Sequence, residues 1–184
     1  MEMKISKMFK RIASICLAVT MVMGCTAIST AADTTTQYTA TADVYVAKKD
    51  NIIKAMDAYL TDTAVPPTSA PSQNATVEVL SSGYNVTVTL NNEYFELKSI
   101  ATDSKAIDST NNITATGAKV VSTTTTTSKS GERIQKITFY IPELGEIYKF
   151  DASEYVNVHP FTLLYVGNKS FPISVKVTDL KTVE

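Results

Sequence analysis

Short segments in which apolar and polar residues alternate recur along this chain, and they constrain its fold more than any other feature. Between Tyr84 and Leu90 every second residue is apolar or aromatic, and the residues between them are Asn or Thr. Successive side chains of a strand point to opposite faces of a sheet, so this pattern predicts a strand with one buried face. Similar patterns, complete or partial, predict further strands at 40–46, 76–80, 94–100, 134–141, 147–158 and 171–177.

Seven or eight short strands separated by turns are typical of a β-sandwich. We therefore predict an all-β, immunoglobulin-like antiparallel β-sandwich of seven to eight strands with one short helix. The likeness to immunoglobulins is architectural only, because the chain has no Trp and only two cysteines, both near its N-terminus.

Two segments carry weaker patterns. Apolar residues recur every three or four positions between Ile52 and Leu60, and Asn51 precedes them in the N-cap position. This spacing predicts the one short helix. Further on, Ala118–Val121 predicts a short strand, and the threonine run Thr123–Thr127 predicts an edge strand in its first half.

The closing stretch from Glu154 to Asp179 predicts an antiparallel hairpin, because two alternating segments flank a turn at Gly167 and Asn168. The hairpin also carries four aromatic side chains that could line an apolar cleft: Tyr155, Phe161, Tyr165 and Phe171. We expect any small-molecule site to lie here.

The N-terminus predicts export. A basic segment with four Lys and Arg residues precedes the uncharged run Ile12–Met23, which is typical of a secretory signal peptide over residues 1–32. The alternative is a lipobox at Val22–Cys25, in which Cys25 would carry a lipid. Either way we expect residues 33–184, which contain no cysteine, to form a single domain outside the cell or at its surface.

Composition excludes several classes of partner. Without residues 1–32 the chain keeps 13 Lys and Arg against 17 Asp and Glu, a net charge of −4. A mildly acidic domain without basic clusters is poorly suited to bind nucleic acid. No second long apolar run follows the signal, so we expect membrane contact only through a lipid at Cys25.

The usual catalytic constellations are missing. The chain has a single histidine, His159, which excludes a multi-histidine metal site. Glu143 and Glu146 are separated by Gly145 and preceded by Pro142, so they predict a solvated turn. No glycine-rich phosphate loop is present. We therefore expect no catalysis and no catalytic residues.

Five segments together resemble a known family: Val44–Val46, Ala55–Tyr59, Gly83–Leu90, Ile137–Leu144 and the closing hairpin. In this order and spacing they resemble the NEAT (near-iron-transporter) domain, the β-sandwich by which Gram-positive bacteria capture haem at the cell surface. The resemblance covers roughly residues 39–179, nearly all of the chain after the signal. It implies haem as the ligand, and haem or a haem-carrying protein as the partner.

The resemblance also implies a site. The short helix would form one lip of the haem pocket with Ala55, Met56 and Tyr59, and the last two strands would form the other. Haem-binding members carry Tyr-x-x-x-Tyr in the last strand, where the first tyrosine ligates ferric iron and the second hydrogen-bonds to it.

This chain departs from that motif. Phe171 stands where the second tyrosine belongs, and Gly167 stands four residues earlier. The nearest tyrosine is Tyr165, which becomes the candidate iron ligand, with Phe171 and Ile173 on the hairpin side of the pocket. The alternative is a structural or adhesive cell-surface sandwich that has lost the haem ligand and binds protein or glycan.

Overall fold

The structure is a computed structural model that describes residues 36–51, 54, 56–106, 114–158 and 165–183. The chain divides into two compact units, Met1–Thr34 and Thr35–Glu184, and the described residues all belong to the second unit. The predicted signal peptide and Cys25 therefore lie outside the described residues.

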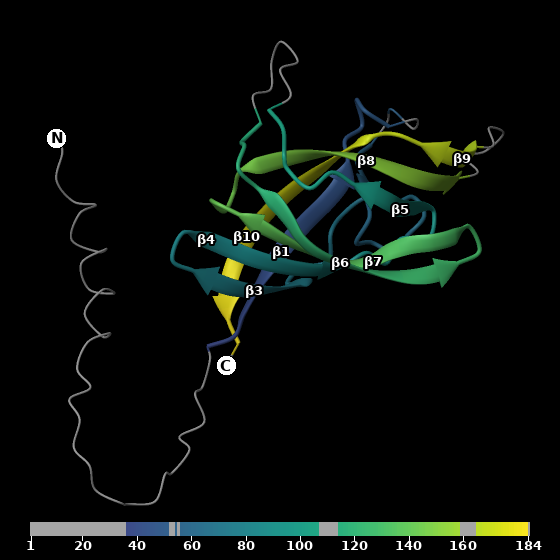
Figure 1. Ribbon diagram of the computed structural model, residues 1–184. Helices are drawn as coiled ribbons and strands as arrows, with labels where there is room; N and C mark the ends of the chain where they lie inside the picture. The colour runs from purple at the N-terminus through teal and green to yellow at the C-terminus, as the bar shows by residue number, and fades with distance from the viewer. Residues whose placement is uncertain (1–35, 52–53, 55, 107–113, 159–164, 184) are drawn as a thin grey trace, which may run out of the picture. The chain divides into compact units, whose positions relative to one another are not determined.

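The described part is built from antiparallel strands (Figure 1). The ten strands are β1 (Tyr38–Val46), β2 (Ala58–Tyr59), β3 (Ala75–Leu80), β4 (Gly83–Thr89), β5 (Phe95–Ile100), β6 (Lys119–Ser128), β7 (Gly131–Ile141), β8 (Ile147–Val158), β9 (Tyr165–Lys169) and β10 (Pro172–Thr182). The all-β antiparallel prediction is confirmed, although the strands outnumber the seven or eight that we expected.

The strands join into one sheet in the order β5-β8-β10-β1-β3-β4-β7-β6, with β2 beside β1 and β9 beside β8. The sheet is strongly curled into a half-barrel, and the curl brings β5 against β7 near the two ends of the strand order (Figure 1). β1 lies at the centre, because it pairs with β10 along one edge and with β2 and β3 along the other.

The concave face of the sheet holds the core. Along β1 the buried residues alternate with half-buried ones, and Ala40, Ala42, Val44 and Val46 face the core. The rings of Phe139 in β7 and Phe150 in β8 meet there with centroids 5.4 Å apart. Full burial of such side chains contributes roughly 1.5–3 kcal/mol each, which makes the core the main source of stability.

The predicted short helix is wrong, since the described residues contain no helix. Met56 lies in a bend, and Ala58–Tyr59 form β2 beside Tyr45 and Val46. Ala58 and Leu60 are fully buried while Tyr59 is half-buried, so tertiary pairing imposes a period of two on a segment with helical spacing. Ile52, Ile53 and Ala55 lie outside the described residues.

The turn predicted at Gly167 and Asn168 is also wrong. Both residues lie within β9, paired with Val156 and Tyr155 of β8. The connection between β8 and β9 falls on residues 159–164, which are outside the described residues and include His159. A Gly-Asn pair favours a turn locally, but here the antiparallel ladder with β8 continues through it.

β9 and β10 follow one another along the same edge of β8. Lys169 of β9 pairs with Glu154 of β8, and Pro172 of β10 pairs with Asp151 of β8. The two pairs are three residues apart on both sides of the ladder, so the register is the same for β9 and β10. The two strands therefore behave as one long strand with a break at Ser170 and Phe171. The predicted strand pair is thus a continuation of one strand, with β8 as the partner of both parts.

β6 is longer than predicted. The short strand at 118–121 and the threonine run merge into one ten-residue edge strand. Its pairing with β7 is interrupted by irregularities between Val120 and Ser122 and between Thr124 and Thr125. Among the described residues, no helix is long and apolar enough to cross a membrane.

Candidate functional site

The structure brings two of the predicted site segments to one end of β1. Val46 pairs with Ala58 of β2 on one side and with Ile173 of β10 on the other. Neighbouring strands lie about 4.8 Å apart, so the backbones of Ala58 and Ile173 are about 10 Å from each other. Segments more than a hundred residues apart in the sequence therefore flank the same strand end.

The predicted side chains at this end lie in different surroundings. Ile173 is fully buried in the core. Tyr59 lies on the opposite side of the sheet, where its ring stacks on that of Tyr45 with centroids 5.2 Å apart and an angle of 28° between the planes. Met56 is half-buried, and its carbonyl oxygen accepts a hydrogen bond from Asn51. Tyr59 and Ile173 thus face opposite sides of the sheet.

Phe171 lies at the break between β9 and β10. It is half-buried and lines a separate cavity of about 480 Å³ together with Ser99, Ile100, Ser153 and Pro172 among others. Tyr165, the candidate iron ligand, is the first residue of β9 and pairs with Val158 of β8. Ala55 lies outside the described residues.

A small cavity of about 230 Å³ opens beside the Tyr45–Tyr59 pair. Its lining carries three lysines and one carboxylate, and includes Tyr45, Lys48, Lys49, Asp57, Lys149 and Ser174. Lys149 is almost fully buried, and its ammonium lies 3.1 Å from a carboxylate oxygen of Asp50. Burial, and secondarily the charge of Asp57, raises the pKa of Tyr45 above its usual value. With Asp50 counted beside Asp57, the three lysines exceed the carboxylates by one charge, and the Tyr45 hydroxyl stays protonated at neutral pH.

A second and larger site was missed by sequence reasoning: a polar cleft between β5, the outer side of β8 and the tip of the β6–β7 hairpin. It has a volume of about 630 Å³ and is lined by Glu93, Tyr94, Glu96, Thr126, Thr127, Ser128, Lys129, Ser130, Arg133, Gln135, Tyr155 and Asn157. We call it the polar cleft.

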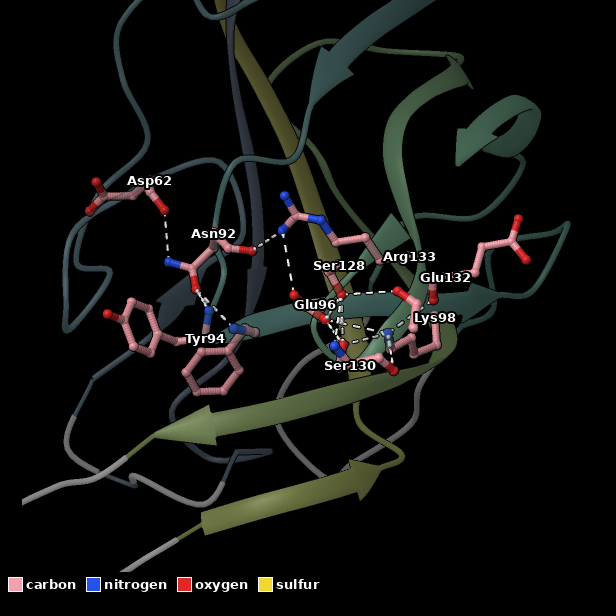
Figure 2. Close-up of polar contacts among 11 residues, drawn as sticks. Asp62, Asn92, Tyr94, Glu96, Lys98, Ser128, Ser130, Glu132 and Arg133 are labelled. Carbon is pink, nitrogen blue, oxygen red and sulfur yellow. Dashed lines mark hydrogen bonds and ion pairs between the residues drawn. The ribbon is translucent and has the colours of Figure 1, made fainter. Parts of the chain in front are cut away.

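The floor of the polar cleft is organised around Glu96 (Figure 2). This carboxylate is only 5 % exposed, and it accepts hydrogen bonds from the hydroxyls of Ser128 and Ser130. The Lys98 ammonium lies 3.3 Å from it and the Arg133 guanidinium 3.9 Å. A buried carboxylate is stable only with such partners, so these side chains hold one another in place.

Lys98 and Arg133 extend the cluster to both sides. Lys98 donates to the Ser130 hydroxyl at 2.7 Å and to the carbonyl oxygen of Glu132 at 2.9 Å, and its ammonium lies 5.6 Å from the centre of the Tyr155 ring. Arg133 donates to the carbonyl oxygen of Asn92 at 2.8 Å. The cluster thereby joins β5 to the tip of β6 and β7 (Figure 2).

Asn92 in turn fixes the entry to β5. Its side-chain oxygen accepts hydrogen bonds from the amides of Tyr94 and Phe95, both at 2.8 Å, and its side-chain nitrogen donates to the Asp62 carbonyl. The sequence held one signal of the cluster: Glu96 and Lys98 alternate with the apolar Phe95 and Leu97, which puts both charges on one face of β5. Nothing in the sequence showed that the β6–β7 hairpin covers that face.

The described residues contain no cluster of three or more His, Cys, Asp or Glu side chains that could hold a metal ion. No protein-family model, no curated protein and no solved structure matches the chain. Its function must therefore be argued from its own residues.

Proposed function

We propose that this chain is an exported, non-catalytic binding module of the NEAT type, which captures haem or a haem-carrying protein at the end of β1. In this proposal residues 1–32 are a secretion signal, with a lipid at Cys25 as the alternative mode of attachment. The curled sheet would then be a variant of the immunoglobulin-like NEAT sandwich.

The observation that supports the proposal best is the position of Val46 between Ala58 and Ile173. The family resemblance implies a pocket between the segment after the first strand and the last two strands. The pairing of β1 with both β2 and β10 puts these two segments on either side of one strand end. Tyr165, the candidate ligand, begins β9, which runs into β10 along the same edge of β8.

The 230 Å³ cavity adds chemical support. Haem carries two carboxylates, and Lys48, Lys49 and Lys149 line the cavity beside Tyr45 and its stacking partner. Ligand pockets usually have volumes of roughly 300–1,000 Å³, so this cavity fits the carboxylate edge of a porphyrin and not the whole ring. Tyr165 is the candidate iron ligand that the resemblance implies, although it begins β9 eight residues before Ile173, roughly 26 Å away along the strand.

Titration of the purified protein with hemin tests the proposal. We expect a Soret band that saturates at one haem per chain, and Tyr165→Phe should weaken binding at least about tenfold because the phenolate ligand is lost. Tyr84→Phe, a half-buried tyrosine in β4, is the matched control and should bind like the parent protein. Absence of a saturable Soret band in the parent protein would remove haem as the ligand.

A further inference from the structure

The polar cleft is distinct from the cavity beside Tyr45, because its lining comes from β5, β6, β7 and the outer side of β8, together with residues next to these strands. It shares none of its lining residues with the cavity beside Tyr45. Its volume of about 630 Å³ lies within the range of roughly 300–1,000 Å³ that is typical of small-ligand sites. The cleft is therefore large enough to act as a site of its own.

The chemistry of its lining narrows the class of ligand. Planar amide groups come from Gln135 and Asn157, hydroxyls from Thr126 and Thr127, and charged donors and acceptors from the Glu96 cluster. Such groups both donate and accept hydrogen bonds, as recognition of hydroxyl-rich ligands requires.

Aromatic side chains complete the lining. Tyr94 and Tyr155 are both half-buried, so part of each side chain is available to a ligand. A tyrosine offers an apolar ring face together with a polar hydroxyl. The ring face can pack on the C–H groups of a sugar while the polar groups around it bind the sugar hydroxyls.

The charges in the cleft argue against two other classes of ligand. Glu93, Glu96, Lys129 and Arg133 line the cleft and Lys98 pairs with Glu96 beneath it, so the local charges nearly balance and do not favour a polyanion. The scarcity of aliphatic residues in the lining disfavours an apolar ligand. A neutral polar ligand fits both conditions.

We infer that the polar cleft is a binding site for a short neutral oligosaccharide, held by packing on Tyr94 and Tyr155 and by hydrogen bonds from Gln135, Asn157 and the Glu96 cluster. The buried Glu96 cluster fixes Ser128, Ser130 and Arg133 of the lining before the ligand arrives. Binding to such a preorganised site avoids part of the entropy cost of ordering side chains. This site would attach the module to a glycan surface independently of any haem.

Isothermal titration of the protein with triacetylchitotriose, cellotriose and mannotriose tests the inference. At least one trisaccharide should bind with a dissociation constant in the micromolar to millimolar range. Gln135→Ala and Asn157→Ala should each weaken it about five- to tenfold, the loss expected for one hydrogen bond. Both variants should keep the thermal midpoint of the parent, since no intramolecular side-chain hydrogen bond of either residue is present in the described part of the chain.

Lys136→Ala, the exposed neighbour of Gln135 that does not line the cleft, is the matched control and should bind like the parent. Tyr165→Phe should also leave trisaccharide binding unchanged, which separates this inference from the haem proposal. Failure of all three trisaccharides to bind up to millimolar concentration would show that the Glu96 cluster only braces the hairpin. Equal weakening by Lys136→Ala would likewise overturn the site.

Discussion

Glu154 is an ionisable residue in fully buried surroundings. The side chain is fully buried in β8, between Leu97 of β5 and Lys169 of β9 in the strand register. One carboxyl oxygen accepts a hydrogen bond from the Phe171 amide at 3.2 Å, and the other has no hydrogen-bond partner in the structure. Burial raises the pKa of Glu154 to about 8, so the carboxyl keeps its proton at neutral pH.

This raised pKa predicts that the protein becomes less stable as the pH rises. Below about pH 4.5 the carboxyl is protonated in both states, whereas between about pH 4.5 and 8 the unfolded chain has lost the proton that the folded protein keeps. The free energy of unfolding should therefore fall over this range, by an amount on the order of 2–4 kcal/mol. Urea unfolding at pH 5, 6.5 and 8 measures it.

Glu154→Gln should remove most of this pH dependence and make the protein more stable than the parent at pH 8, because the amide stays neutral and can still accept from Phe171. The exposed Glu143→Gln is the control, and it should leave the pH profile of the parent unchanged. A parent protein whose stability is constant between pH 5 and 8 would contradict a raised pKa at Glu154.

Gly83 is required at the turn between β3 and β4. Its φ is +149°, and a Cβ placed there would lie 2.6 Å from the Ile141 carbonyl oxygen and 2.9 Å from the Tyr140 ring. Gly83→Ala should therefore lower the free energy of unfolding by about 1–3 kcal/mol. Gly131→Ala is the comparison variant, because its positive φ of +97° strains the backbone but no atom lies within 4 Å of the added methyl, so there is no steric clash. Its loss, measured by the same urea unfolding, should be smaller.

At the scale of elements, the attachment of the β6–β7 hairpin to β5 depends on Lys98. Its ammonium makes hydrogen bonds to Ser130 and Glu132 and pairs with the buried Glu96. Lys98→Met keeps most of the aliphatic chain and leaves Glu96 with fewer partners. We expect amide hydrogen exchange at residues 128–132 to accelerate at least about tenfold, while exchange in β1 and β10 changes much less. Lys136→Met, at an exposed position in β7, should change neither region.

The elements differ in how far the sequence predicts them. β3 and β4 were predictable because their alternation and the Ser81-Ser82 turn are local signals. β2 was not, because its two residues form a strand only through pairing with Tyr45 and Val46. β9 was misjudged for a similar reason: Gly167 and Asn168 favour a turn locally, yet both are held in the ladder by β8.

At the scale of the whole molecule, neither the curl of the sheet nor the polar cleft that depends on it could be predicted from the sequence. Alternation shows which face of each strand is buried, but it carries no information on which strands meet across the core. The approach of β5 to β7 depends on the summed twist of all the strands between them. Ala58 and Ile173, which flank Val46, come from the two segments in which the resemblance implies a pocket, and a helix was expected where β2 lies.

The pairing of β1 with β10 also decides how the domain would respond to a mechanical load. Tyr38 pairs with Thr182 at one end of the ladder and Val46 pairs with Ile173 at the other. Tension applied through the residues before Tyr38 and after Thr182 would load this terminal pair first and then break the pairs one after another. Sequential rupture of this kind requires only a low force. If the domain were attached to a surface through the residues next to Tyr38 or Thr182, the Val46 end would lie about 30 Å from the attachment point, because β1 has nine residues.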